Sequence, residues 1–545
     1  MNFIQTTLKE NKIIAIVAIV YLISSVSFIF TSGWERCDIK GNNCTVEVAE
    51  YHAHDAFWHM AIAENSFEAF PPSNPVYSGV ILKGYNYLFD FILFITDKIF
   101  RISPLHGYFH FFPIVTSLFY IVSVYYFVTN FGFDKKQKIF VSLFLFLGNS
   151  YAFLMTLFSQ GTLTGSSVRG FPLVLSLQPT TMFYNHQYAL SLPIILFSLV
   201  YIRNHKDAMK KYIFLGVIIV LLTLLKAYAG ISVLLLLIIY LILKTRKNNL
   251  VSSMFYAALL STLFLVATIF IGGGGGKTFS FDQFAFVRSL IDDPSHFYRE
   301  NIALARVTLE TSGKFSPRLV LLYFVFTSLW YLVNFGARTF FILNIAAFFR
   351  SKEKTLNLAL VTTIIILSLV PLFVLQKGDW FNTMQFMYYA VFFSSISAGV
   401  ATASVIGLKK YMVYSLIIIT LLIPLADQIR HSFLAKKVVL SADFINTTNH
   451  LRSLPKGDVT TFGMPAQDSR IAAFSGQTQS IADIPVLVNI FVDYEKRKEE
   501  TETFGYVKSA KYIFVDKQKY QIEDKRLKNK KLLYQNEGYA ILENI

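Results

Sequence analysis

Charged residues are scarce in this sequence of 545 residues, at 15% of the total, whereas a soluble protein carries about a quarter. A soluble fold must have a solvated surface, so this shortage excludes a soluble enzyme. Hydrophobic residues make up 54% and the mean hydropathy is +0.49. Apolar runs of about 20 residues recur, the length that crosses a bilayer core. The sequence therefore predicts a polytopic membrane protein and excludes the fibrous and disordered classes.

Cysteine is almost absent, since only Cys37 and Cys44 occur. The six residues between them include Gly41 and Asn42, and they are enough to close a small ring. Thiols outside the cytoplasm tend to pair. A disulfide is therefore favoured over two unpaired thiols, and neither state indicates catalysis.

Acidic residues are fewer than basic ones, and the formal net charge is +16. Residues 431–545 contribute little to this excess, with 17 Lys/Arg and 14 Asp/Glu, and they show no basic stripe with interleaved aromatic residues. Most of the remaining excess lies in short clusters between apolar spans, which is typical of the positive-inside rule. We therefore expect a lipid bilayer as partner and no nucleic acid.

The density of charge changes once along the chain. Residues 1–430 carry about 12% charged residues and residues 431–545 about 27%. We predict an all-α polytopic membrane domain over 1–430, which includes a long loop at 31–106, and a small extracytoplasmic α/β domain over 431–545. About 115 residues are enough for an independent core.

The second domain shows helix and strand signals. Ser441 is placed to cap a helix that runs to Arg452. Residues 458–462 and 511–515 are rich in β-formers. The runs 532–534 and 539–542 flank Asn536, Glu537 and Gly538, which predicts a hairpin.

Hydropathy predicts about eleven membrane spans in the first domain. They are 13–30, 107–131, 138–158, 186–203, 211–228, 230–243, 251–271, 319–348, 356–375, 385–407 and 411–429. The segment 319–348 is too long for a straight crossing, and Gly336 and Arg338 interrupt it. It either tilts or ends in an interfacial segment.

Clusters of basic residues set the orientation. Eleven spans place six of them on one side: Lys9/Lys12, Lys135/Lys136/Lys138, Arg203/Lys206/Lys210/Lys211, Lys244/Arg246/Lys247, Arg350/Lys352/Lys354 and Lys409/Lys410. In the plasma membrane we therefore expect a cytoplasmic N-terminus, with the loop 31–106 and the C-terminal domain outside. The apolar stretch 85–100 must then not cross, and its Asp90, Asp97 and Lys98 suit a helix lying in the interface.

The richest chemistry lies in the first outer loop, where three of the ten histidines fall within residues 52–59. A helix that begins near His54 would place Asp55 and His59 on one face at i, i+4. Phe57 and Trp58 would then rest on the membrane surface. A carboxylate and an imidazole on one face can hold a divalent metal or share acid–base work. The alternative is that Asp55 caps the helix and the histidines sit at the interface. No HExxH motif supports a zinc protease.

Other polar groups lie at the outer ends of spans. Lys226 is close to the end of one span, where it either faces a cavity or extends to the headgroups. His186 opens another span, and Asn382 and Gln385 precede a third. These groups either bind a headgroup or form ordinary polar caps.

This layout resembles the GT-C superfamily of polytopic membrane glycosyltransferases, in an uncharacterised prokaryotic branch. The resemblance is carried by the stretch from Asp55 through Pro71-Pro72 and Asn74-Pro75 to Tyr85-Asn86-Tyr87, by Asn382 with Gln385-Phe386, and by Phe474-Ser475-Gly476 and Tyr534-Gln535-Asn536 in the tail. Only one clear acid, Asp55, stands where the superfamily has an acidic pair, which leaves metal dependence open.

The resemblance implies transfer of a sugar from a polyprenyl-phosphate carrier to an extracytoplasmic acceptor. Asp55 would be the base or a metal ligand, with His59 beside it, because the acceptor hydroxyl must lose a proton. Positive charge is needed where the phosphate departs. The residues implied in binding are His54, Lys226, Arg169, Arg288, Asn382, Gln385 and His186.

Two other functions fit the composition. A transporter or flippase for a lipid-linked or small polar solute would place ionisable residues at mid-membrane, whereas here most lie at outer boundaries. A non-catalytic scaffold would use the tail to bind partners. The sequence identifies neither the sugar nor the acceptor, the carrier or a cofactor.

Overall fold

The computed structural model describes residues 12–38, 43–164, 185–205, 208–245, 250–271, 279–294, 296–313, 316–343, 354–377, 380–405 and 409–544. The chain folds as two compact units. The helical unit comprises Met1–Ser27, Pro113–Ile269 and Gly275–Leu434, and the mixed unit comprises Phe28–Phe112, Phe270–Gly274 and Ala435–Ile545. The change in composition near residue 430 lies close to the end of the helical unit. The long first loop is grouped with the tail, because its strands and helices find their partners there.

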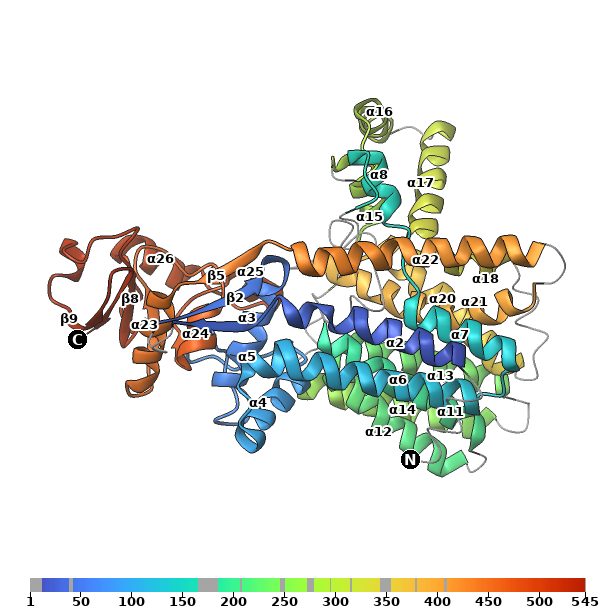
Figure 1. Cartoon of the computed structure of the whole chain (residues 1–545), viewed down its shortest axis with the longest axis horizontal. Coiled ribbons are helices and arrows are strands. Elements are labelled where there is room, and N and C mark those ends of the chain that lie inside the picture. The colour runs from blue at the N-terminus through green and yellow to red at the C-terminus, as the bar shows by residue number, and fades with distance from the viewer. Residues whose placement is uncertain are drawn as a thin grey trace. The chain divides into compact units, whose positions relative to one another are not determined.

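The helical unit is built mainly from long helices (Figure 1). Its longer helices are α2 (Lys12–Val26), α6 (Phe112–Asn130), α7 (Lys135–Leu147), α11 (His186–Asn204), α12 (Ala208–Leu225), α13 (Ala227–Lys244), α14 (Leu250–Phe270), α17 (Pro317–Phe335), α20 (Lys354–Phe373), α21 (Gln385–Ala403) and α22 (Lys409–Leu434). Shorter elements are α8 (Phe153–Gln160), β3 (Phe279–Phe281), α15 (Ala285–Asp292), α16 (Glu300–Thr311), η4 (Gly336–Thr339), α18 (Phe340–Leu343), β4 (Val374–Gln376) and η5 (Trp380–Met384).

Within the described residues, eight helical segments are long and apolar enough to cross a membrane. The protein is therefore a multi-pass membrane protein, but the predicted count of eleven is not confirmed. The predicted span 138–158 is two helices, α7 and α8, separated at residues 148–152. The predicted span 211–228 ends at Leu225, because Lys226 has an extended backbone and α13 begins after it. The segment 319–348 breaks at Gly336, as its sequence indicated.

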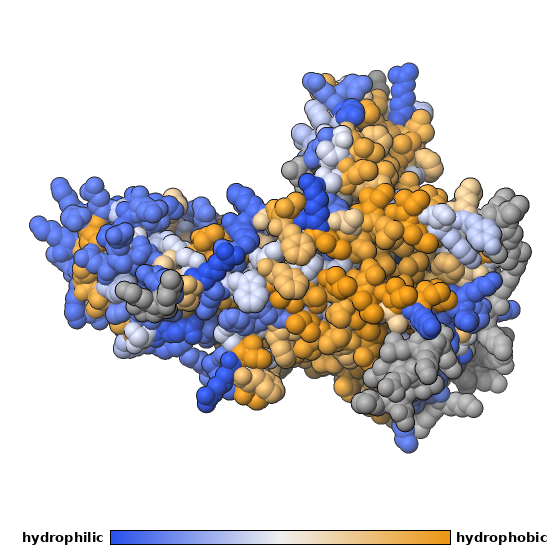
Figure 2. Space-filling model, in the orientation of Figure 1, coloured by the Kyte–Doolittle hydropathy of each residue, from blue (hydrophilic) through white to orange (hydrophobic). Residues whose placement is uncertain are grey.

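Helix α21 lies in the centre of the helical unit, and almost all of its side chains are buried. A Cβ added at Gly399 would lie 2.5 Å from the backbone of Val141 in α7. Only glycine therefore permits this approach, and small residues are the usual means of close helix packing in membranes. By contrast, α14 buries only Leu260 and Ala267. Figure 2 shows hydrophobic side chains spread over the visible surface of this unit, as lipid contact requires.

The mixed unit contains two sheets and short helices. From the first loop come η1 (Ser27–Phe30), β1 (Trp34–Cys37), β2 (Cys44–Ala49), α3 (Glu50–Asn65), α4 (Leu88–Phe100), α5 (Pro104–His106) and η2 (Gly107–Phe111). From the tail come β5 (Lys437–Leu440), α23 (Ala442–Ser453), β6 (Asp458–Thr461), α24 (Arg470–Ser475), β7 (Thr478–Gln479), α25 (Ile484–Asn489), α26 (Glu495–Phe504), β8 (Tyr512–Asp516), η6 (Lys525–Leu527), β9 (Lys531–Gln535) and β10 (Tyr539–Glu543).

Loop and tail share a three-stranded antiparallel sheet in the order β1-β2-β5. Val46 pairs with Leu440 and Ala49 with Lys437. Cys37 and Cys44 face each other across β1 and β2 and are joined by a disulfide. Strand β2 leads directly into α3, so this sheet sets where α3 begins.

The tail forms a five-stranded sheet in the order β7-β6-β8-β10-β9, in which β6 is parallel to β7 and β8. The predicted helix, strands and hairpin are present in this domain. Ser441 caps α23 by accepting from the Phe444 N–H. The hairpin pairs β9 with β10 around residues 536–538. The predicted α/β class of the tail is therefore confirmed.

Candidate functional site

Helix α3 carries the predicted site. The helix begins at Glu50, four residues earlier than the sequence predicted, because the Glu50 N–H already donates to the Lys436 carbonyl beside β5. Asp55 thus lies inside the helix and is not its cap, so the capping alternative is wrong. Phe57 and Trp58 are buried, at 0% and 2% exposure. They do not form the expected membrane-facing surface, because α3 packs against α24 of the tail and α4 of the loop.

Asp55, His59 and Asp90 form a linear chain of polar contacts. The Asp55 Oδ2 atom lies 3.6 Å from His59 Nε2, and His59 Nδ1 lies 2.6 Å from Asp90 Oδ1. Side-chain exposure falls along this chain from 54% for Asp55 to 6% for His59 and 0% for Asp90. One carboxylate is therefore accessible, and a buried imidazole and carboxylate support it from behind.

The contacts of His59 determine its protonation. Burial lowers the pKa of the imidazole, but the charges of Asp90 and Asp55 and its hydrogen bonds to both outweigh burial and raise the pKa to about 10. At neutral pH His59 is therefore a cation between two carboxylates. A doubly protonated imidazole donates from both nitrogens, which fits contacts on either side of the ring.

Aromatic rings enclose the imidazole. The His59 ring stacks on Tyr108 at 5.6 Å and meets the edge of Phe89 at 5.6 Å. The Tyr85 hydroxyl lies 3.5 Å from His59 Nδ1, and its ring contacts Trp58 at 5.4 Å. These rings exclude water from the His59–Asp90 pair, which strengthens the attraction between the two charges.

His54 is held by a residue of the tail. Its Nε2 lies 2.9 Å from the Oδ1 atom of buried Asp483, and Asp483 Oδ2 accepts from the Ser469 hydroxyl at 2.9 Å. The hydrogen bond to Asp483 raises the pKa of His54 against the opposing effect of burial. His54 therefore connects α3 to the tail, while its side chain stays 51% exposed.

The helical unit holds most of the predicted binding residues. Lys226 is buried at the break between α12 and α13, and its Nζ lies 3.5 Å from Gln187 Oε1. His186 is also buried, one residue before Gln187 at the start of α11. The structure thus brings Lys226 to the end of α11, inside the unit and not extended to headgroups.

Four further residues were predicted to bind the substrate. Asn382 and Gln385 contact each other, with Gln385 Nε2 donating to Asn382 Oδ1 at 2.8 Å. Arg288 donates to Asp282 Oδ1 at 2.5 Å and to the Gln283 carbonyl, so an ion pair already satisfies it. Arg169 lies outside the described residues.

Sequence reasoning missed Asp90 and Asp483 as residues of the site. We expected Asp90 to face the interface, but it is fully buried, because His59 compensates its charge. The signal was a carboxylate inside an apolar run, which needs a partner if the run is buried. Asp483 lies 429 positions from its partner His54, and no local pattern predicts that contact.

A divalent metal needs several side-chain ligands in one place, and Asp55 offers one carboxylate. Across the part of the chain that the structure describes, no group of three or more His, Cys, Asp or Glu side chains could hold an ion. The metal role of Asp55 therefore stays a prediction.

Similarity to known proteins was found among solved structures. No protein-family model matches the sequence, and no curated protein matches it. Among solved structures, the chain is similar to ArnT from Cupriavidus metallidurans bound to undecaprenyl phosphate, with 10% identity over 99% of this chain and 98% of ArnT and a TM-score of 0.50.

The oligosaccharyltransferase of Archaeoglobus fulgidus is a second similar structure. Its complex with Zn and sulfate shows 12% identity over 92% of this chain and 68% of that chain, with a TM-score of 0.49. The archaeal oligosaccharyltransferase AglB from Archaeoglobus fulgidus, in complex with an inhibitory peptide and a dolichol-phosphate, shows 12% identity over 93% of this chain and 70% of that chain, with a TM-score of 0.45. At such identities the likeness to ArnT concerns the fold alone. At that level it confirms the predicted resemblance, because the chain shares the fold of ArnT.

Proposed function

We propose that this protein is a membrane glycosyltransferase that moves a sugar from a polyprenyl-phosphate donor to an extracytoplasmic acceptor. One observation carries the proposal: the exposed carboxylate of Asp55 is held by the buried His59–Asp90 pair. The GT-C fold supports it, because ArnT with this fold binds undecaprenyl phosphate. A transporter or scaffold would not need an oriented carboxylate of this kind.

Asp55 acts as the base. As the acceptor hydroxyl attacks the anomeric carbon of the sugar, its proton passes to the Asp55 carboxylate. The His59 cation lies 3.6 Å from Asp55 Oδ2 and attracts that carboxylate, and Asp90 keeps His59 protonated and oriented. His59 and Asp90 are thus positioning residues, and of these three residues Asp55 is the one that contacts the acceptor hydroxyl.

The departing phosphate needs positive charge, because negative charge grows on it as the glycosidic bond breaks. Lys226 supplies this charge in our proposal, with Gln187 orienting its ammonium. Asn382 and Gln385 add amide groups that can donate to phosphate oxygens. Arg288 is not assigned a role, since Asp282 already neutralises it.

The test is Asp55→Asn in the purified full chain, assayed with labelled polyprenyl-phosphate sugars. The amide keeps the shape of the side chain but cannot accept a proton at neutral pH. We expect transfer to fall by about 10²–10⁴-fold, the usual value of general-base assistance.

Asp97→Asn is the matched control. Asp97 is on α4 of the same unit and is paired with Lys98 at 2.9 Å, so its loss should leave transfer unchanged. Wild-type turnover of Asp55→Asn would end the catalytic assignment, provided that both variants purify as folded protein.

The orientation belongs to the same proposal: the N-terminus is cytoplasmic and the tail is outside, as the basic clusters indicate. A reporter that is active only in the cytoplasm, fused after Ile545, should remain silent. A strong signal would reverse the orientation and place Asp55 away from an extracytoplasmic acceptor.

A further inference from the structure

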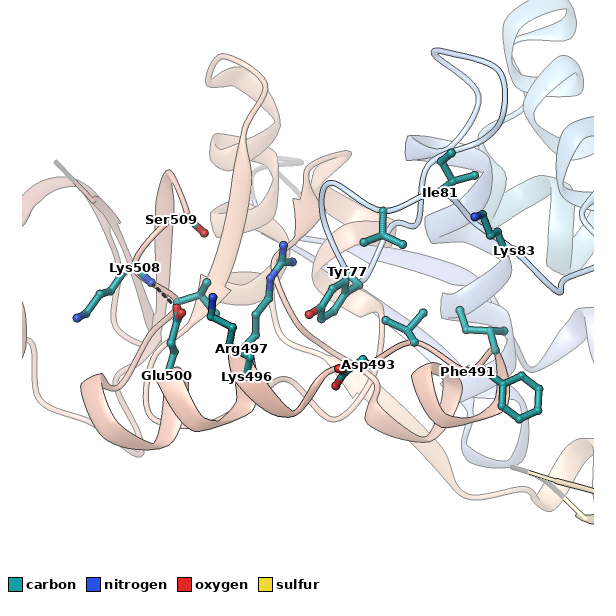
Figure 3. Close-up of a pocket in the computed structure, with 14 residues that line it drawn as sticks. Tyr77, Ile81, Lys83, Phe491, Asp493, Lys496, Arg497, Glu500, Lys508 and Ser509 are labelled. Carbon is teal, nitrogen blue, oxygen red and sulfur yellow. Dashed lines mark hydrogen bonds between the residues drawn. The ribbon is translucent and has the colours of Figure 1, made fainter. Parts of the chain in front are cut away.

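A second site lies within the mixed unit, apart from the Asp55 chain. A cleft of about 740 Å³ opens between loop residues 77–83, the segment after α25, helix α26 and residues 507–509 (Figure 3). Its volume lies within the range of about 300–1,000 Å³ that is usual for ligand pockets. The proposed transfer reaction uses none of its residues.

Arg497 forms a rigid, charged wall of this cleft. Its guanidinium donates to the Ser480 carbonyl at 2.6 Å and to the Ser78 carbonyl at 2.9 Å, and it lies 4.0 Å from the centre of the Tyr77 ring. These acceptors are neutral, so the contacts fix the geometry of Arg497 without cancelling its charge. A preorganised cation of this kind favours an anionic ligand.

Lysines add to this charge. Lys83, Lys496 and Lys508 line the cleft with exposed side chains, whereas Asp493 and Glu500 are the acidic residues of the lining. The cleft is therefore positive overall but retains carboxylates. A ligand that suits it must carry negative charge for the cations and hydrogen-bond donors for the carboxylates.

Apolar groups form the remaining wall. Phe491 is 55% exposed and its φ is +58°, a conformation that a bulky side chain rarely adopts. Ile81 is 40% exposed, and Figure 3 shows both side chains at the same end of the cleft. An exposed aromatic face beside hydrogen-bonding groups suits the apolar face of a sugar ring.

We propose that this cleft binds an acidic glycan chain, whose sugars carry carboxylate or phosphate groups, as the acceptor. Hydroxyls and negative charge occur together on such a ring, which satisfies the cations and the carboxylates at once. A concave cleft of this volume suits a chain better than a flat membrane surface. The inference rests on the proposed function only where it identifies the bound glycan as the acceptor of the transfer. Binding of the glycan can be measured without transfer.

The experiment uses the full chain in phosphatidylcholine nanodiscs at low salt, with fluorescent oligogalacturonate as probe and maltooligosaccharide of equal length as the neutral comparison. We expect oligogalacturonate to bind and maltooligosaccharide to bind at least tenfold more weakly. The double variant Lys83→Gln/Lys496→Gln should weaken binding by about tenfold, since each exposed charge contributes about two- to fivefold.

The matched control is Lys525→Gln/Lys528→Gln, which removes the same charge from exposed lysines outside the cleft and should leave binding unchanged. Equal binding of both sugars, or equal loss in the control, would overturn the proposal. Displacement of the probe by soluble glycerophosphoglycerol, which is the headgroup of phosphatidylglycerol, would assign the cleft to lipid headgroups instead. Asp55→Asn should bind the probe normally, so failure of transfer and failure of binding are separate results.

Discussion

The two units solve the problem of buried polar groups in different ways. In the helical unit, Arg338 is fully buried, and its Nε donates to Ser395 Oγ at 2.8 Å and its Nη1 to the Asn149 carbonyl at 3.3 Å. Both acceptors are neutral. In the mixed unit, buried His59 meets the carboxylate of Asp90 at 2.6 Å.

The two buried groups differ in whether they change their protonation state with pH. An arginine that donates to carbonyl and hydroxyl oxygens keeps the same contacts at every ordinary pH. An imidazole between carboxylates exists in two protonation states, and the strength of its contacts depends on which one is present. The mixed unit can therefore hold an oriented, reactive carboxylate, while the Arg338 contacts hold the helices together independently of pH.

The largest effect on stability is expected for Asp90→Asn. Removing one member of a buried ion pair costs about 3 kcal/mol, because His59 loses the charge that compensates it. We expect amide hydrogen exchange in α3 and α4 to accelerate by about a hundredfold. The half-buried control Asp97→Asn, which loses only the ion pair with exposed Lys98, should stay within about 0.5 kcal/mol of wild type. Unchanged exchange in Asp90→Asn would show that the pair does not stabilise this part of the mixed unit.

A smaller effect is expected for Arg338→Met in the helical unit. The change leaves the Asn149 carbonyl without this donor, at a cost of about 2 kcal/mol, and the methionine fills much of the vacated space. Thermal unfolding in detergent should shift downwards, equally at pH 7 and pH 9. Arg318→Met, at an exposed position on α17, is the control that should not shift. A pH-dependent shift for Arg338→Met would contradict the comparison between the units.

The smallest effect is the response of the wild-type protein to pH. His59 has a folded pKa of about 10, above its ordinary value of 6.5, so the folded state binds the proton more tightly than the unfolded state. The stabilisation is therefore complete below pH 6.5 and is lost as pH rises towards 10. Protection of α3 against hydrogen exchange, corrected for the intrinsic pH effect, should fall across this window. His59→Gln should abolish this dependence.

Local sequence signals predicted much of the architecture correctly. The Ser441 hydroxyl caps α23 by accepting from the N–H of Phe444, which is three residues further along the chain. The hairpin at 536–538 joins strands that are adjacent in sequence. The interruption of 319–348 was visible in Gly336, whose φ of +54° favours glycine. Such features depend on residues close together in the chain, so their patterns can be read directly.

The membrane spans were predicted less accurately where tertiary contacts decide where a helix ends. Hydropathy predicted a continuous span over 138–158, yet the backbone leaves the helix at Gly148, where a Cβ would lie 2.3 Å from the Arg338 guanidinium. An average over an apolar window cannot detect a helix that ends at a single glycine, where a residue about 190 positions away comes into contact.

The sequence by itself determined the membrane class, the α/β tail and the i, i+4 placement of Asp55 and His59, because these follow from composition and helical periodicity. Only the tertiary structure decided that Asp90, 31 positions from His59, supports that pair, and that Asp483 holds His54. Two charges separated by a long loop attract strongly only when folding removes them together from water. The chemistry of the site therefore depends on the fold that brings its carboxylates together.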